Sequence, residues 1–153
     1  MAVDFRSILS PQAMCLGMSA RTSDEVIRLL GERLIALGKV KADYPDALIS
    51  RESTMPTGLP LGTINVAVPH SDPVHVVAPA IALATLEEPV SFGSMDDPED
   101  RIPVQIVIAL ALTDKDAQIE MLQAVAGFIQ NPEALAALAE ARTPEEAFSA
   151  LPT

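Results

Sequence analysis

Apolar side chains recur every three to four residues in two long segments of the chain, and this spacing predicts two amphipathic helices. The first is expected over TSDEVIRLLGERLIALGKV, with Thr22 or Ser23 as its N-cap, acidic residues in its first turn and an end at Gly38. The second is expected over DAQIEMLQAVAGFIQN, residues 116–131. The apolar stripes are Val26, Leu29, Leu30, Leu34 and Leu37 in the first helix, and Ile119, Leu122, Val125 and Ile129 in the second.

Shorter helices are expected over residues 44–53, 132–141 and 143–151. The first of them has Pro45 near its start, a position that proline favours. It carries Arg51 and Glu52 in its last turn. The chain shows neither an internal repeat nor a low-complexity tract, so we expect a single domain over residues 1–153.

Candidate strands alternate with these helices. They are INVAV (64–68), AIALATL (80–86) and VQIVIALAL (104–112). The last is apolar throughout, which is typical of a central strand covered on both faces. Strands interleaved with helices predict an α/β fold. We expect one layered domain with a mixed, mostly parallel sheet of about five strands flanked by helices.

Composition narrows the classes of function. A formal net charge of -11 argues against nucleic acid, which rewards basic surfaces, and it suits a basic protein partner or plain solubility. The chain has one cysteine, Cys15, so no disulfide framework is expected, and we interpret it as a small buried side chain. The sequence shows neither an export signal nor an apolar run of 18 residues, so we expect a cytoplasmic protein without direct membrane insertion. The methionines are interpreted as core-filling residues.

The stretch RESTMPTGLPLGTINVAVPHSD, residues 51–72, contains the first of the two histidines. His70 comes just after a predicted strand, where ligand crevices of open α/β sheets lie. Pro69 before it fixes φ, and the upstream glycines permit tight backbone paths. Both a functional histidine and a structural one that bonds a carbonyl at the strand end remain open at this point.

Several familiar chemistries do not fit the pattern. His70, Asp72 and His75 are crowded into six loop residues, and no further Cys or His elsewhere completes a zinc site. The chain has no G-x-S-x-G nucleophile elbow. TGLPLG lacks both the lysine of a phosphate loop and the G-x-G-x-x-G spacing. A histidine nucleophile remains, and an imidazole nitrogen can take a phosphoryl group covalently. Neither a metal nor a cofactor is expected.

These residues resemble the active-site segment of the enzyme IIA components of the sugar phosphotransferase system, in the fructose and mannitol class. The matching positions are Arg51, Glu52, Thr57, Gly58, Val68, Pro69 and His70. The similarity extends from Thr22 to Leu151. Within the class the chain is most similar to the galactitol type, which shares the run PDALISRE and a second histidine five residues after the first, as His75 is here. The mannitol pattern has its second histidine where this chain has Gln118.

The resemblance implies a phosphotransferase with a phosphohistidine intermediate. His70 would accept a phosphoryl group from the phosphohistidine carrier protein (HPr) and pass it to a cysteine of an enzyme IIB. The membrane IIC component would take part indirectly, in uptake and phosphorylation of a polyol such as galactitol. Arg51 would bridge phosphoryl oxygens with its planar guanidinium, unless it only pairs with Glu52 or Asp46. Thr57 would donate a hydrogen bond.

Asp72 and Pro73 are typical of an N-cap and a first helical position, so a short helical turn is expected to place His75 back toward His70. His75 would there donate to the phosphoryl group, unless it lies on the far side of the turn. A regulatory domain of the nitrogen type, which acts by binding target proteins, is the alternative function.

Overall fold

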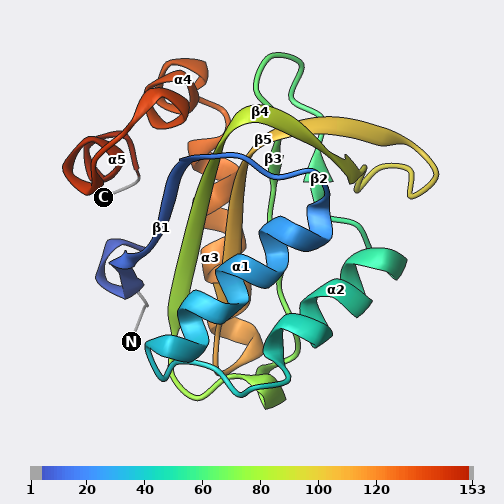
Figure 1. Ribbon diagram of the computed structural model, residues 1–153, viewed down its shortest axis with the longest axis vertical. Helices are drawn as coiled ribbons and strands as arrows, with labels where there is room; N and C mark the ends of the chain where they lie inside the picture. The colour runs from blue at the N-terminus through green and yellow to red at the C-terminus, as the bar shows by residue number, and fades with distance from the viewer. Residues whose placement is uncertain (1–4, 152–153) are drawn as a thin grey trace.

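The computed structural model describes residues 5–151, which form a five-stranded sheet with helices on both faces (Figure 1). The strands are β1 (Leu9–Met18), β2 (Gly58–Leu59), β3 (Val66–Ala67), β4 (Ala80–Gly93) and β5 (Arg101–Ala111). The helices are α1 (Ser23–Ala36), α2 (Tyr44–Thr54), α3 (Lys115–Phe128), α4 (Pro132–Glu140) and α5 (Pro144–Ala150). Two short 3-10 turns, η1 (Arg6–Ile8) and η2 (Pro73–His75), complete the described elements.

The sheet has the order β1-β4-β5-β3-β2 within the described residues. β1 and β4 are parallel, as are β3 and β5, whereas β4 with β5 and β2 with β3 are antiparallel. The expected mixed sheet of about five strands is confirmed, and β5 is its central strand. The expected parallel majority is not seen, because β4 and β5 form a hairpin that the sequence pattern did not reveal.

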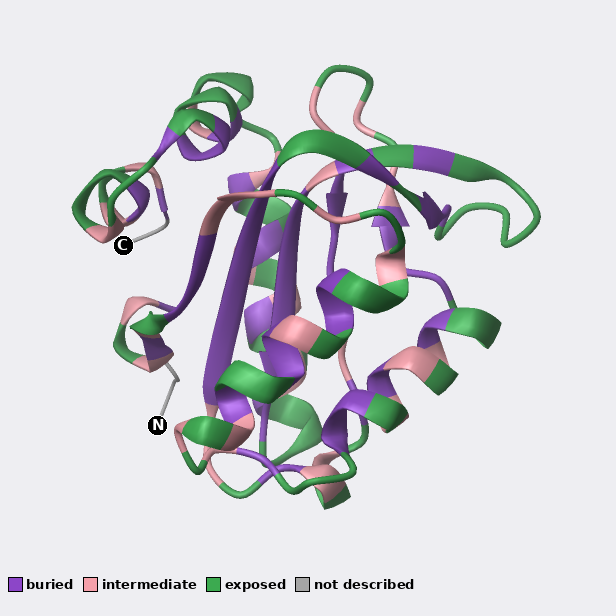
Figure 2. Ribbon diagram, viewed as in Figure 1, coloured by how far each residue is buried: buried purple, intermediate pink, exposed green. Residues whose placement is uncertain are grey.

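Two apolar cores lie on the two faces of the sheet (Figure 2). Where β4 and β5 pair over residues 80–84 and 106–111, alanines and Val107 face α1 and α2, and larger aliphatic side chains face α3 and α4. The alanines are Ala80, Ala82, Ala84, Ala109 and Ala111, and the larger side chains are Ile81, Leu83, Ile106, Ile108 and Leu110. Alanines bring the backbone of α1 close to the sheet, while the branched residues fill the wider space under α3.

Side-chain caps explain where several helices begin. Thr22 accepts a hydrogen bond from Glu25 N, Asp114 from Ala117 N, and Thr143 from Glu146 N. Each bond satisfies one backbone donor that the first helical turn leaves free. Gly38 follows α1 with φ of 72°, a backbone conformation that glycine adopts without strain. The expected positions of all five helices are confirmed to within a few residues.

The strands differ more from expectation than the helices. β4 continues to Gly93, seven residues past its expected end, because a register shift between Thr85 and Val90 lets the exposed Glu87 and Glu88 interrupt the apolar pattern without ending the strand. β3 is shorter than the expected run. β2 was expected as part of a loop.

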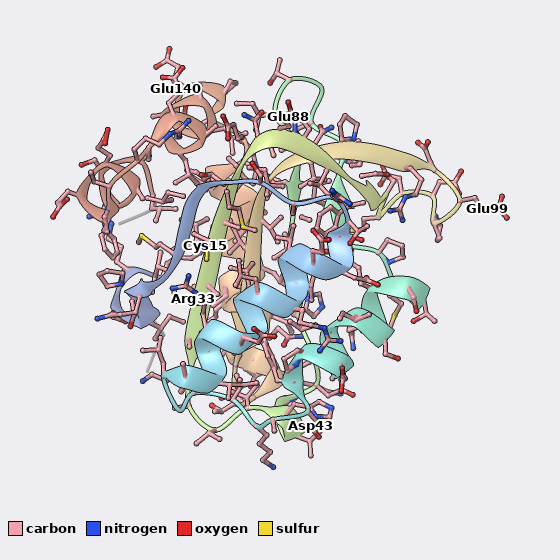
Figure 3. The ribbon with its side chains drawn as sticks, viewed as in Figure 1. Cys15, Arg33, Asp43, Glu88, Glu99 and Glu140 are labelled. Atoms are coloured by element: carbon pink, nitrogen blue, oxygen red, sulfur yellow. The ribbon has the colours of Figure 1, made fainter. Side chains whose placement is uncertain are left out.

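Cys15 lies on β1, facing α1 across the core, as expected for a small buried side chain (Figure 3). Burial raises the pKa of its thiol, although the charge of Arg33 opposes this effect. The thiolate is the reactive form of cysteine. Cys15 is therefore a packing residue. No helix of residues 5–151 has the length and apolar character needed to cross a bilayer.

Close packing between α1 and α2 depends on Gly31. A Cβ added there would lie 2.7 Å from Pro45 Cγ and 3.2 Å from Pro45 Cα. We expect Gly31→Ala to lower the free energy of unfolding by about 1 to 2 kcal/mol, since overpacking outweighs the roughly 1 kcal/mol that alanine gains over glycine in a helix. Denaturant unfolding measures the change.

Gly127 provides the matched control for this variant. It lies within α3, and a Cβ added there would meet nothing within 4 Å. Gly127→Ala should therefore raise stability by about 1 kcal/mol. Equal and positive effects at both positions would contradict the close approach of α1 and α2.

Candidate active site

Several residues of the motif segment line one surface hollow. This hollow of about 300 Å³ is formed by the end of α2, the segment before β2, His70 and the loop between β4 and β5. Its lining residues are Arg51, Thr54, Met55, Pro56, Thr57, His70, Met95 and Pro98. We call it the His70 hollow. Three of the predicted site residues, His70, Arg51 and Thr57, therefore lie together.

Contacts with the central strand fix the chain at His70. The residue forms a parallel bridge with Leu110 of β5. The Leu110 N–H donates to the Pro69 carbonyl oxygen over 2.9 Å, and the buried Tyr44 hydroxyl donates to the Leu110 carbonyl oxygen over 2.8 Å. His70 is therefore attached to the rigid middle of the sheet, although it follows the last residue of β3 by three positions.

The imidazole of His70 has a defined tautomer when it is neutral. Its Nδ1 lies 2.9 Å from the Val68 carbonyl oxygen, and because a carbonyl oxygen can only accept, Nδ1 carries the proton. Nε2 is then the nitrogen with a free lone pair. Burial lowers the pKa of His70, and the Arg51 charge acts in the same direction, against the Val68 bond and Asp72. Burial and the Arg51 charge thus favour the neutral ring.

Thr57 and Glu52 form a buried hydrogen-bonded pair beside His70. The Thr57 N–H donates to Glu52 Oε1 over 2.9 Å, and the Thr57 hydroxyl donates to Oε2 over 2.9 Å. The Thr57 oxygen in turn accepts from the Val68 N–H over 3.0 Å. A hydroxyl has one proton, so Thr57 has none left for a phosphoryl group in this arrangement. Burial raises the pKa of Glu52, although its bonds from Thr57 oppose that effect.

Two glycines let the segment before β2 lie against the end of β4. A Cβ added at Gly58 would lie 2.5 Å from the Gly93 carbonyl oxygen, and one added at Gly93 would lie 2.8 Å from Pro56. The Gly58 carbonyl oxygen accepts from the Met95 N–H over 2.7 Å. Gly58 of the motif therefore serves close backbone approach, which brings Met95 to the His70 hollow.

Arg51 forms an ion pair, though with a partner that the sequence did not suggest. Its Nη1 lies 3.3 Å from Asp72 Oδ1. Asp46 instead pairs with Arg28 over 3.0 Å, and Glu52 is bonded to Thr57. The expected side-chain cap at Asp72 is also absent: η2 forms as a short turn, but the Asp72 carboxylate accepts no hydrogen bond from a backbone N–H of that turn. Arg51 remains about a quarter exposed in its side chain, so a ligand can reach it.

The structure does not bring His75 into the His70 hollow. His75 lines a neighbouring hollow of about 270 Å³, and Arg51, Thr54 and Met55 line both hollows. Its Nδ1 lies 3.1 Å from Oδ1 of Asp43, but it has no hydrogen-bond partner among the described residues. Asp43 lies just before α2 (Figure 3). His75 therefore faces the start of α2, on the side of η2 that is turned away from the His70 hollow.

Sequence reasoning missed two apolar residues of the site. Met55 and Met95 line the His70 hollow and are 53% and 46% exposed, whereas methionines were interpreted as core-filling residues. Met14 and Met121 do fit that interpretation. The position of Met55 inside the motif segment was the one available signal.

Gln118 lies in the first turn of α3, and its buried Oε1 lacks a hydrogen-bond partner among the described residues.

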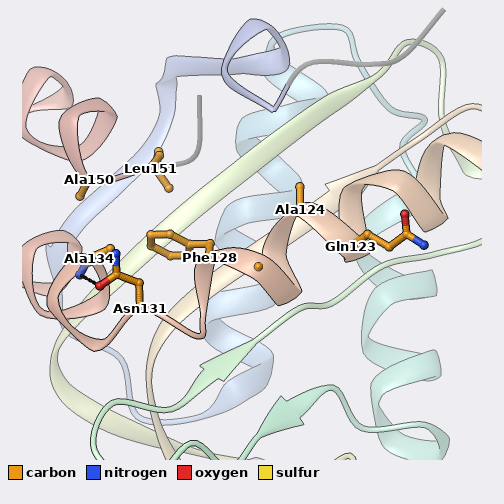
Figure 4. A pocket seen from close by; sticks show the side chains of 8 residues that line it. Gln123, Ala124, Phe128, Asn131, Ala134, Ala150 and Leu151 are labelled. Carbon is orange, nitrogen blue, oxygen red and sulfur yellow. Dashed lines mark hydrogen bonds between the residues drawn. The ribbon is translucent and has the colours of Figure 1, made fainter.

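One larger hollow of the described surface differs from the His70 hollow in its chemistry. A larger hollow, of about 390 Å³, lies between the end of α3 and the segments of α4 and α5 (Figure 4). It is lined by Gln123, Ala124, Gly127, Phe128, Asn131, Ala134, Ala150 and Leu151, none of which is titratable. Asn131 is there occupied in capping α4. Within residues 5–151, no three His, Cys, Asp or Glu side chains lie together as a metal site would require.

Comparisons with known proteins agree with this geometry. Residues 7–152 match the family model described as phosphoenolpyruvate-dependent sugar phosphotransferase system, EIIA 2. The chain is similar to the galactitol-specific EIIA component of Escherichia coli (strain K12), with 34% identity over 117 residues that cover 76% of this chain and 77% of that protein.

Solved structures support the same assignment. The crystal structure of IIA mannitol from Escherichia coli has a TM-score of 0.77 and 25% identity, and the match covers 94% of this chain and 98% of that one. The complex of enzyme IIAMTL with phosphorylated enzyme IIBMTL from Escherichia coli has the same fold, with a TM-score of 0.76, 24% identity and coverage of 92% and 94%. This chain belongs to the EIIA 2 family of the phosphoenolpyruvate-dependent sugar phosphotransferase system, and it is a phosphotransferase of that system.

Proposed function

We propose that His70 accepts a phosphoryl group from the phosphohistidine carrier protein (HPr) and passes it to a cysteine of an enzyme IIB. The transfer serves uptake of a polyol, with galactitol suggested by the 34% identical relative. One observation carries the proposal: the bond from His70 Nδ1 to Val68 leaves Nε2 as the nucleophilic nitrogen in a hollow that Arg51 also lines. The match over residues 7–152 supports a single enzyme IIA domain over residues 1–153.

The bonds exchanged in each step follow from the tautomer of His70. The Nε2 lone pair attacks phosphorus, the P–N bond of the donor phosphohistidine breaks, and the donor imidazole leaves with that electron pair. In the second step a cysteine thiolate of enzyme IIB attacks phosphorus and the bond to Nε2 breaks. Nδ1 keeps its proton throughout, so His70 returns to its starting form.

Charge on the phosphoryl oxygens must be stabilised in both steps. Positioning and preorganised positive charge supply most of the catalysis in phosphoryl transfer. Arg51 supplies that charge, since its guanidinium can bond two oxygens at once. The exposed Met55 and Met95 beside His70 provide apolar contact area for the two partner proteins, which bind one after the other. The membrane IIC component takes part indirectly.

A regulatory role of the nitrogen type has weaker support. Nitrogen Regulatory Protein IIA-Ntr from Neisseria meningitidis has the same fold, with a TM-score of 0.72, but 22% identity. At that identity the likeness concerns the fold alone. The carrier function is therefore the one that we propose.

His70 should carry the phosphoryl group by itself. Incubated with phosphoenolpyruvate, enzyme I and HPr, the protein should gain one phosphate that is labile in acid and stable in alkali, as expected for phosphohistidine. His70→Ala should gain none, because it lacks the Nε2 nucleophile. Mass spectrometry of the intact protein measures the gain. Labelling of a folded His70→Ala protein would refute the assignment.

Arg51 should lower the barrier of each transfer. Loss of a charge-assisted, two-pronged contact in Arg51→Ala should cost about 2 to 4 kcal/mol, or roughly 30- to 1000-fold in rate. Arg51→Lys should recover part of this loss, because lysine keeps the charge without the planar fork. Rapid-quench kinetics with phosphorylated HPr measures the rates.

Arg28 is a suitable control for Arg51. It is an arginine on α1 that pairs with Asp46 at the surface, away from the His70 hollow. Arg28→Ala removes the same charge and should leave the transfer rate within about twofold of wild type, since exposed ion pairs contribute little. Equal losses in both variants would assign the effect to net charge.

His75 should assist only weakly. His75 lies beside Asp43 and lines the neighbouring hollow, not the His70 hollow, so in this arrangement it places no donor next to a phosphoryl group on His70. We therefore expect His75→Ala to accept phosphate at a rate lowered by less than about 10-fold, the loss of one weak contact. The same kinetic assay measures it. A loss above about 100-fold would show that His75 turns into the His70 hollow.

A further inference from the structure

We propose that Glu52 and Thr57 are positioning residues that hold His70 in its reactive tautomer and at a fixed distance from Arg51. They act through the backbone of Val68 and touch neither the phosphoryl group nor the partner proteins. The inference rests on the proposed role of His70, but its first readout, the tautomer of the ring, can be measured without any phosphoryl transfer.

The hydroxyl of Thr57 has a fixed polarity. Its oxygen lies 2.9 Å and 3.1 Å from the two Glu52 carboxylate oxygens. In the ionised carboxylate both oxygens accept and cannot donate, so the hydroxyl proton then points to Glu52. The lone pairs of the same oxygen are thereby directed to the Val68 N–H, which donates over 3.0 Å. The carboxylate thus determines that Thr57 acts as an acceptor toward Val68.

Val68 transmits this constraint to the imidazole. Its N–H is held by Thr57, and its carbonyl oxygen accepts from His70 Nδ1 over 2.9 Å. Because the two groups belong to one residue of restricted backbone freedom, the position of the N–H limits the direction of the carbonyl. A Val68 N–H without Thr57 would seek another acceptor, and the carbonyl would turn away from Nδ1.

Burial makes this arrangement hard to replace. Glu52 is 8% exposed, Thr57 2% and Val68 1%. Water has little access to the three groups, so a hydrogen bond removed here leaves an unpaired buried group, whereas at the surface water would take its place.

The same bonds connect the nucleophile to its cation. Glu52 follows Arg51 directly in the last turn of α2, and its carboxylate receives both the Thr57 N–H and the Thr57 hydroxyl. The helix that carries Arg51 is thereby joined to the strand that leads to His70. Catalysis of phosphoryl transfer depends on such geometry, and a displacement of about 1 Å can cost roughly 100-fold in rate.

Thr57→Val is the decisive variant, since valine keeps the shape of threonine and removes the hydroxyl. Nitrogen-15 spectra of the imidazole ring above pH 8 distinguish a protonated nitrogen from one with a lone pair. We expect wild-type His70 to carry its proton on Nδ1 and the variant to show a substantial Nε2–H population. Transfer from phosphorylated HPr should fall by about 10- to 100-fold. The chain has two histidines. The spectrum of His75→Gln contains the ring signals of His70 alone and therefore assigns them.

Two further variants separate positioning from general stability. Thr57→Ser keeps the hydroxyl and should restore the wild-type tautomer and most of the rate. Thr85→Val is the matched control: Thr85 is also fully buried, and its oxygen accepts from the Gly17 N–H over 2.7 Å, between β1 and β4. It should lower stability as Thr57→Val does, while the tautomer and the transfer rate stay at wild-type values.

Each result bears on the inference. An unchanged tautomer and rate in folded Thr57→Val, or equal rate losses in Thr57→Val and Thr85→Val, would overturn it. If Thr57→Val does not fold, the wild-type spectrum still decides, since a ring protonated mainly on Nε2 overturns the inference directly. A wild-type protein with the Nδ1–H tautomer that takes no phosphate from HPr would refute the proposed function and leave the tautomer result standing.

Discussion

The buried carboxylate of Glu52 is the charge on which the arrangement of the active site depends. Burial of a carboxylate is costly unless it is bonded, and here Thr57 supplies both a backbone and a side-chain donor. Those bonds determine where the chain runs after α2, because Gly58 must then lie against the Gly93 carbonyl oxygen. That path of the chain sets the direction of β2 and the place of Met95. It also provides the acceptor for the Val68 N–H.

The topology of the sheet explains why this site lies where it does. β3 and β5 run parallel as neighbours, and ligand sites of α/β sheets gather at the carboxyl ends of such strands. His70 follows β3 at this end, and α3 starts there after β5. The bond from Leu110 to Pro69 then joins the two strand ends. A flexible loop could not hold an imidazole in one fixed position, because the backbone groups of the loop would form hydrogen bonds with water.

Much of the fold could be predicted from the sequence, because the spacing of apolar residues and the capping residues mark where helices lie. Thr22 and Gly38 bound α1 as expected. The hairpin of β4 and β5 was not predicted, because the polar Glu87 and Glu88 lie within β4. Such polar residues usually mark the end of a strand. The family motif placed His70, Arg51 and Thr57 at one site. It could not show that Arg51 pairs with Asp72 or that the Thr57 hydroxyl donates its hydrogen bond to Glu52, because these contacts join segments whose relative position only packing decides.

The pairing of Arg51 with Asp72 also has a consequence for a carrier. A protein that must give its phosphoryl group away gains nothing by binding it very tightly, since the ground state would then become a trap. In the proposed mechanism Arg51 exchanges its ion pair with Asp72 for a contact with the phosphoryl group, so the net stabilisation is the difference between two contacts to the same guanidinium. The pair is partly exposed, where such contacts are worth at most about 1 kcal/mol. On the proposed mechanism, Asp72 would weaken binding of the phosphoryl group without removing the positive charge that the transition state requires, and transfer in two successive steps demands this balance.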